Sequence, residues 1–165
     1  MNAIQADMLV LREQLRRGAL PRAYRALIAY MQALRMRFAN RYGDSAVSAL
    51  YQGYLDMTYF AVFPPALKER GLKIAVVFNY EAFRFEAWLA ARNRKVQRQY
   101  WELFKEGAWD GYRVVAPAQG IDSIVECDLA ADFDFGDLES LSAGIERTTA
   151  AFLADLEVFL AAHPD

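Results

Sequence analysis

The sequence of 165 residues contains one cysteine and one histidine, so it has little of what metalloproteins and many hydrolases use. A lone cysteine, Cys127, cannot form an intramolecular disulfide, and this usage is typical of a reducing compartment. The only histidine, His163, lies at the C-terminal end of the chain, where fraying is common. We therefore expect no Ser-His-Asp or Cys-His catalytic unit and no metal site rich in histidine or cysteine. The run 128–137 contains four aspartates, but its spacing is not that of an EF-hand loop. Solvated turn acids without a bound metal are therefore favoured over the alternative, a magnesium or calcium site made of carboxylates alone.

The sequence also lacks long apolar runs and glycine-rich loops. No apolar run approaches the roughly 18 residues of a membrane-spanning helix. Asp7, Arg12 and Glu13 interrupt the N-terminal segment where a signal peptide would be apolar. We therefore expect a cytoplasmic protein that contacts no membrane. Because the glycines stand singly, we also expect no phosphate-holding loop and no cofactor.

What the sequence does contain is typical of one folded domain. Hydrophobic residues make up 55% of the chain and charged residues 24%, which excludes disorder. A chain of this length buries roughly 70% of its unfolded surface, enough for one core. The longest interruption, Phe63-Pro64-Pro65, is too short to separate two cores. We predict a single domain over residues 1–165.

The net charge of −2 conceals an uneven distribution. Residues 1–43 contain eight arginines and two carboxylates, whereas residues 110–165 contain two arginines and twelve carboxylates. The two ends can attract each other within one chain or between two chains, and the second case would give a homo-oligomer. Alternatively, the basic part forms an electropositive face for an acidic partner.

Apolar residues that recur every three to four positions predict four helices. These helices cover residues 3–17, 21–38, 93–105 and 137–160. In the first, the apolar stripe consists of Ile4, Met8, Leu11 and Leu15, and Gly18 follows its end. Asp137 is a suitable N-cap for the last.

Alternation and runs of β-branched and aromatic residues predict five strands. These strands cover residues 54–63, 72–78, 83–89, 112–116 and 123–129. Residues 79–82 fit a hairpin loop between the second and third, although a helix beginning near Glu81 is an alternative. The order ααβββαββα predicts an α+β domain with a mainly antiparallel sheet of about five strands. The N-terminal helix pair, a central helix and a long C-terminal helix surround that sheet.

One face of the predicted strand 83–89 carries Arg84, Glu86 and Trp88. On a covered sheet these form a buried charged pair, which is costly unless it is hydrogen-bonded and which then marks a site or specifies the fold. On an uncovered sheet they form a solvated pair of little consequence. Asp56 and Thr58, on the neighbouring strand, join the same patch if the register allows it.

A second candidate is the basic cluster at the start of the third predicted helix. It consists of Arg92, Arg94, Lys95 and Arg98. Cations at the positive end of a helix dipole disfavour local stability, but with the free backbone amides they suit an anion. Tyr100 and Trp101 offer stacking, as in grooves for single-stranded nucleic acid. The alternative is a solvated basic face, which agrees with a pI near 5.5.

Several segments carry a family resemblance, among them YQGYLDMTYF (51–60), FRFEAWL (83–89) and NRKVQRQYW (93–101). On these segments the chain resembles an uncharacterised bacterial family of small single-domain proteins. The resemblance covers nearly the whole chain and implies no particular activity.

The leading hypothesis is a binding or interaction module for an anionic partner, either nucleic acid or an acidic protein surface. Its ligand-binding residues would be Asp56 together with Arg84, Glu86, Trp88 and the basic cluster. One alternative is an enzyme that uses Asp56, Glu81 or Glu86 as acid or base. Another is a homo-oligomeric structural protein joined through its charged helices.

Overall fold

The structure is a computed structural model that describes residues 2–164. Its helices are α1 (Ala3–Arg17), α2 (Ala19–Arg41), α3 (Pro65–Lys68), α4 (Arg94–Glu106) and α5 (Leu138–Ala161). Its strands are β1 (Ala46–Val47), β2 (Met57–Phe63), β3 (Leu72–Asn79), β4 (Arg84–Ala91), β5 (Arg113–Val114) and β6 (Ser123–Ala130). The predicted α+β class is confirmed, with all four long helices present.

The strands form one six-stranded sheet in the order β1-β2-β3-β4-β6-β5, and every neighbouring pair is antiparallel. In the central hairpin, Phe78 lies opposite Phe85 and Asn79 opposite Arg84. The hairpin prediction for residues 79–82 is therefore confirmed, and a helix beginning near Glu81 is wrong.

The structure corrects the prediction in the segment before β2. Residues 54–56 precede the strand and form a turn, because Gly53 and Leu55 both adopt positive φ, 73° and 64°. The proline pair that was expected only to stop β2 also starts α3, since proline fits the first turn of a helix, where its missing N–H has no partner. Strand β1 was not predicted, because two residues carry no periodicity.

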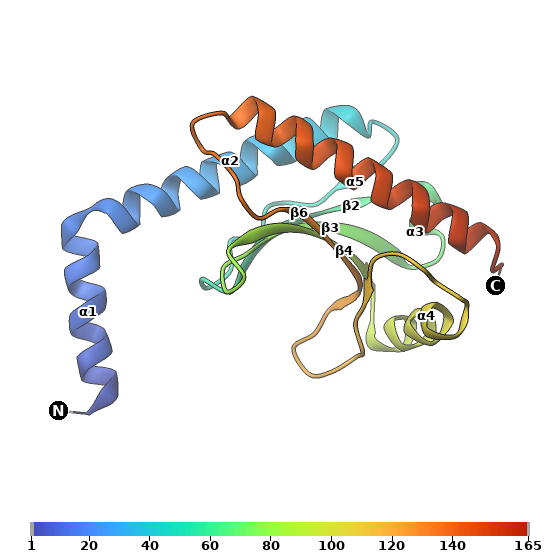
Figure 1. Cartoon of the computed structure of the whole chain (residues 1–165), viewed down its shortest axis with the longest axis horizontal. Coiled ribbons are helices and arrows are strands. Elements are labelled where there is room, and N and C mark those ends of the chain that lie inside the picture. The colour runs from blue at the N-terminus through green and yellow to red at the C-terminus, as the bar shows by residue number, and fades with distance from the viewer. Residues whose placement is uncertain (1, 165) are drawn as a thin grey trace.

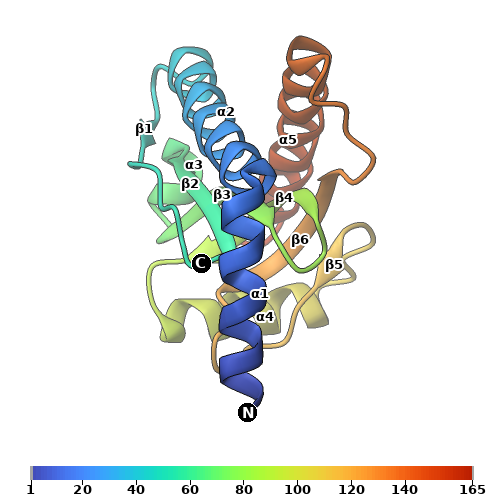
Figure 2. The ribbon, with the colours of Figure 1, turned by 90° about the vertical axis from the view of Figure 1, so that its left-hand side faces the viewer.

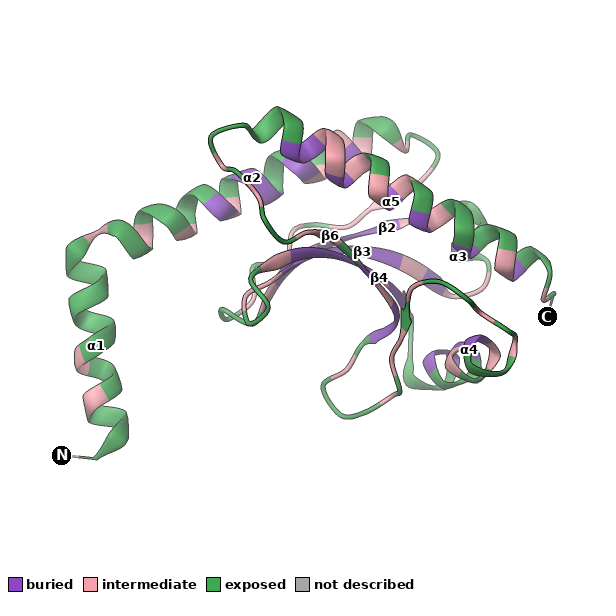
Figure 3. Ribbon diagram, in the orientation of Figure 1, coloured by how far each residue is buried: buried purple, intermediate pink, exposed green. Residues whose placement is uncertain are grey.

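Helices α2 and α5 lie side by side on one face of the sheet, α2 over β1 and β2 and α5 over β4 and β6 (Figures 1 and 2). We call this the covered face. Phenylalanine, valine and leucine side chains from the strands pack beneath the helices. Figure 3 shows the central strands coloured largely as buried. The Arg37 guanidinium of α2 bonds Glu139 and Glu146 of α5, at 2.6 and 2.9 Å. The basic and acidic ends of the chain thus attract each other within one chain at this point.

The other two long helices flank the sheet rather than cover it (Figure 1). Helix α4 lies at one end, where Val96, Tyr100 and Phe104 join the apolar core that includes Ile124 of β6. Helix α1 leaves the other end of the molecule at Gly18 and buries no residue (Figure 3). Among residues 2–164, no helix combines the length and the apolar character needed to cross a bilayer.

Candidate binding site on the open sheet face

The face of the sheet opposite α2 and α5 is concave, and α4 lies only at one end of it (Figure 1); we call it the open face. Successive side chains of a strand point to opposite faces. In β4, Phe85 and Ala87 therefore enter the core beneath the helices, and Arg84, Glu86 and Trp88 point to the open face. The three residues predicted to share one face do so.

Glu86 is only 1% exposed although no helix covers it. Arg84 Nε donates to its Oε1 at 2.7 Å, and Trp88 Nε1 donates to its Oε2 at 2.6 Å. Asn79 Nδ2 of the neighbouring strand approaches Oε1 at 3.4 Å. We call these four residues the Glu86 cluster. Both carboxylate oxygens have donors, which offsets the desolvation of the buried charge.

A second layer of charges surrounds the Glu86 cluster. Arg84 also lies 3.3 Å from Asp128 Oδ1, and Arg113 of β5 lies 2.7 Å from Glu126 and 3.6 Å from Asp128. Glu126 further accepts from Ser123 Oγ at 2.6 Å. Sequence reasoning missed Arg113, because its contact depends on β5 pairing opposite Glu126 of β6. These ion pairs compensate the acidic side chains of the open face.

Next to the Glu86 cluster the open face forms a hollow of about 250 Å³. It is lined by Met57, Tyr59, Lys73, Ala75, Trp88, Ala90, Ala91 and Asp122. Trp88 belongs to both the hollow and the cluster, so its ring is oriented by Glu86. Tyr59 of β2 lines the same hollow, and burial raises the pKa of its hydroxyl. The hollow therefore offers two partly exposed aromatic rings and one cation, Lys73.

The basic start of α4 adjoins this hollow through Asp122. Arg94 lies 3.2 Å from Asp122 Oδ1, and its Nη1 donates to Gln97 Oε1 at 2.8 Å and to the Ile121 carbonyl. Asn93 caps the helix by accepting from the Val96 amide at 2.9 Å. The two features that the sequence singled out separately are therefore neighbours, and Asp122, which joins them, was not predicted.

The remaining three basic residues are exposed. Arg92, Lys95 and Arg98 form no ion pair with any residue in the range 2–164. The side chain of Arg92 packs against Gly71: its Cδ lies 3.0 Å from the position that a Cβ atom would take at residue 71. The backbone at Gly71 therefore limits where the aliphatic part of Arg92 can lie. Only Arg94 of the predicted basic cluster is neutralised by a partner.

Asp56 and Thr58 do not join this patch, because the register between β2 and β3 does not place them on the open face. Asp56 stays within the turn before β2, where donation by the Tyr54 and Met57 amides lowers the pKa of its carboxyl. Thr58 lies buried and bonds the Gln52 carbonyl at 2.6 Å and the Tyr80 hydroxyl at 2.7 Å. Its partner in the sheet is Phe78, a residue of the covered face.

The carboxylates considered for acid or base chemistry do not converge. Glu81 is exposed in the turn between β3 and β4, Asp56 is held by its own turn, and Glu86 has donors on both oxygens. Cys127 packs as a small apolar group on the covered face. Burial there raises the pKa of its thiol to about 11, which makes it unreactive near neutral pH. Within residues 2–164, no group of three or more histidine, cysteine or acidic side chains is placed to hold a metal ion.

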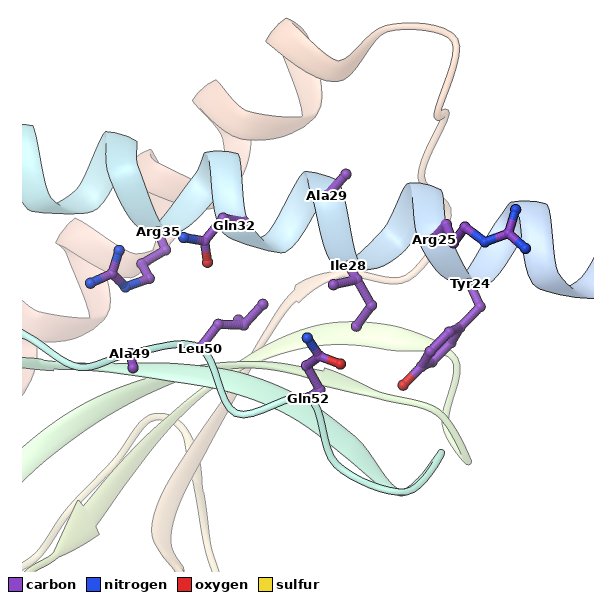
Figure 4. A pocket seen from close by; sticks show the side chains of 9 residues that line it. All are labelled: Tyr24, Arg25, Ile28, Ala29, Gln32, Arg35, Ala49, Leu50 and Gln52. Atoms are coloured by element: carbon purple, nitrogen blue, oxygen red, sulfur yellow. The ribbon is translucent and has the colours of Figure 1, made fainter.

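A larger hollow lies elsewhere, between α2 and residues 49–52, with a volume of about 690 Å³ (Figure 4). Figure 4 shows Arg25 and Arg35 at its opposite ends, with guanidinium groups directed away from its centre. Arg35 is held there by the Ser48 carbonyl at 2.5 Å. Ile28 and Leu50 occupy the middle. None of the predicted site residues lines this hollow.

Comparison with known proteins identifies the family but no activity. No curated protein and no solved structure matches the chain. One family model, described as a domain of unknown function, DUF7000, matches residues 4–160. The match covers nearly the whole chain and confirms the resemblance to an uncharacterised family. The chain therefore belongs to the DUF7000 family of domains of unknown function.

Proposed function

We propose that the domain is a binding module whose open face and α4 start together hold an anionic partner, and that this partner is single-stranded nucleic acid. The observation that carries the proposal is that the start of α4 adjoins the hollow of Trp88 and Tyr59 through the Arg94–Asp122 ion pair. The same helix start carries three exposed cations that form no ion pair within residues 2–164, Arg92, Lys95 and Arg98. Surfaces for single-stranded nucleic acid combine cations that follow the backbone with rings on which bases stack.

The orientation of Trp88 supports the stacking part of the proposal. Its indole nitrogen donates to Glu86 Oε2, and that carboxylate is held in turn by Arg84 on the same strand. A ring fixed in this way loses little side-chain entropy when a base stacks on it. The Glu86 cluster then serves to position Trp88, and its buried charge has a use beyond stability.

The local charge of the site supports the electrostatic part, although the whole chain is slightly acidic. The nearest acidic side chains, Asp122, Glu126 and Asp128, are each paired with an arginine. Lys73 lines the hollow, with its ammonium group 5.9 Å from the centre of the Phe63 ring. Exposed cations gathered at the start of α4, together with Lys73, attract anions locally even when the net charge of the protein has the opposite sign.

An acidic protein surface would use the same cations but would not need the rings. The two partners therefore differ in their dependence on Trp88. Substitution of that residue by leucine weakens stacking by about 1–3 kcal/mol per base lost and leaves long-range attraction intact.

The test is fluorescence anisotropy of labelled single- and double-stranded oligonucleotides, titrated with the protein at low and moderate salt. We expect single strands to bind more tightly than duplexes, with an affinity that falls as salt rises. Replacing Arg92, Lys95 and Arg98 together by glutamine should remove most of the binding. The matched control replaces three exposed arginines of α2, Arg22, Arg25 and Arg41, by glutamine and should retain it.

Three outcomes would contradict the nucleic-acid proposal. No binding at low salt would exclude the ligand class. An equal loss in the α2 control would show that only overall charge matters. Binding that survives Trp88→Leu unchanged would favour an acidic protein surface as the partner.

A further inference from the structure

Helix α1 exposes an apolar stripe that nothing in its own chain covers. Ile4, Met8, Leu11 and Leu15 are 70%, 54%, 41% and 49% exposed, and the helix contains no buried residue. Their spacing of four, three and four residues places them on one side of the helix. An exposed contiguous apolar surface of this kind marks an interaction site more often than a solvated face.

The helix is well terminated, yet it lacks a reason to be stable alone. Asn2 caps its start by accepting from the Gln5 amide at 2.8 Å, and Gly18 ends it in the left-handed conformation, with φ 80°. An isolated helix of about 15 residues is marginal in water, because most helical stability comes from packing of the apolar side. The stripe therefore requires a partner that lies outside its own chain.

The same end of the molecule contains an apolar cavity of about 490 Å³. It is lined by Leu20, Ala23, Tyr24, Ala26, Leu27, Leu55, Phe78, Tyr80, Phe83, Phe133 and Phe135. Leu55 and Phe83, at its rim, are 55% and 62% exposed. Gly18 has a left-handed backbone conformation, and the chain turns there so that α1 points away from the sheet (Figures 1 and 2). The apolar stripe of α1 therefore does not cover the cavity of its own chain.

We propose that the stripe of α1 packs into this cavity of a second copy of the chain, and that the exchange is reciprocal. Leu20 lines the cavity and lies two residues after Gly18, so the cavity is at the base of α1. A twofold axis beside this corner brings each α1 to the cavity of the other copy, as a closed isologous dimer requires.

Charge complementarity favours a second copy over other occupants. The C-terminal half of α1 carries Arg12, Arg16 and Arg17, and within residues 2–164 only Arg17 has an acidic partner, Glu13. The loop that contributes Phe133 and Phe135 to the cavity also carries exposed Asp132, Asp134 and Asp137. A docked stripe places the arginines of one copy near these aspartates of the other, whereas the aspartates would repel an anionic lipid surface.

The size of the contact also fits a dimer. Helix α1 has 15 residues and 11 residues line the cavity. In a reciprocal dimer each copy can contribute residues of both sets to the interface. Stable protein interfaces of standard size use about 20–30 residues a side. The apolar centre with a charged rim is the usual composition of such a contact.

The test measures molar mass by light scattering and dissociation by sedimentation at micromolar concentrations. One variant, Met8→Asp/Leu11→Asp, spoils the stripe, and another, Ala23→Arg, fills the cavity from an exposed position of α2. We expect the wild-type chain to be a dimer and each variant to raise the dissociation constant at least tenfold. The control Val158→Asp, on an exposed apolar residue of α5, should remain a dimer.

Mixing the two variants separates exchange from other arrangements. In the mixture, the intact stripe of one copy meets the intact cavity of the other, which restores one of the two contacts. We therefore expect heterodimers at concentrations where each variant alone is largely monomeric. A wild-type monomer at the highest concentration overturns the proposal, and co-sedimentation of that monomer with anionic vesicles would assign α1 to a lipid surface. A dimer that survives Ala23→Arg, or a mixture that stays monomeric, also overturns it, because α1 then docks elsewhere. Circular dichroism verifies that each variant is folded.

Discussion

The two faces of the sheet bury their side chains by different means. On the covered face, Phe60, Phe78 and Phe85 are fully buried because α2 and α5 lie over them. On the open face, Glu86 is almost as buried, but its cover consists of neighbouring polar side chains of the same sheet. Stability on the covered face is therefore spread over many apolar contacts. On the open face it depends on a few hydrogen bonds, which a ligand or a single substitution can alter.

The largest effect is expected on the covered face. Phe78 contacts the rings of Tyr80, Phe83, Phe85 and Phe133, at centroid distances between 5.0 and 5.9 Å. Phe78→Ala should lower the free energy of unfolding by about 3–5 kcal/mol, because it removes transfer energy and leaves a cavity. Urea denaturation measures this loss. Val158→Ala, on the exposed side of α5, is the control and should stay within about 0.5 kcal/mol of wild type.

The next effect distinguishes the open face. Glu86→Ala should cost about 3 kcal/mol, because it leaves the Arg84 and Trp88 donors without their buried acceptor. Glu86→Gln keeps an acceptor oxygen and should cost clearly less. The joint replacement Arg84→Met/Glu86→Leu should return most of the lost stability, since apolar residues of similar volume often substitute for a buried ion pair.

If that double variant is stable but no longer binds oligonucleotides, the Glu86 cluster serves function rather than folding. If the double variant is as unstable as Glu86→Ala, the open face is an integral part of the core and the contrast between the two faces fails. Urea denaturation and the anisotropy titration together give the answer.

A third effect, of intermediate size, concerns pH on the covered face. Burial raises the pKa of the Cys127 thiol from about 9 to about 11, with a further contribution from Asp128. The unfolded chain loses this proton first, so the thiol stabilises the fold below pH 9, and that stability is lost as the pH rises towards 11. The expected loss is on the order of 2 kcal/mol.

Comparison with Cys127→Ala isolates the thiol from other alkaline titrations. Burial and a hydrogen bond to Asp155 raise the pKa of Tyr112 to about 12, and both proteins retain this tyrosine and its hydrogen bond. The difference in free energy of unfolding between wild type and variant should therefore shrink between pH 9 and 11. A difference that is independent of pH would mean that solvent reaches the thiol in the folded protein.

Local patterns of the sequence predicted most elements, because helices and hairpins are set by neighbouring residues. The stripe of α1, the Asp137 cap and the hairpin of β3 and β4 all follow from spacing over a few positions. The error at residues 54–56 has a local cause too. A turn with positive φ at Gly53 and Leu55 precedes β2. The alternation of polar and apolar residues does not reveal such a turn.

The candidate site was only half predictable, because its other half depends on distant strand pairing. The shared face of Arg84, Glu86 and Trp88 follows from alternation within one strand. Which face the helices cover does not, since α2 and α5 come from opposite ends of the chain. Asp122 and Arg113 reach the site only because β6 pairs with both β4 and β5, and no local signal gives that order.

The smallest effect compares two arginines that both belong to the candidate site. Arg84 lies at the buried Glu86, with its own side chain 28% exposed, whereas Arg94 and its partner Asp122 are 58% and 62% exposed. Arg84→Ala should cost about 1–2 kcal/mol, because a buried carboxylate loses its charged donor. Arg94→Ala should cost less than about 1 kcal/mol, since exposed ion pairs are screened by solvent. Melting temperatures of the two variants measure the difference. Equal values would show that water reaches the Glu86 cluster and that its ion pair stabilises the fold no more than an exposed ion pair does.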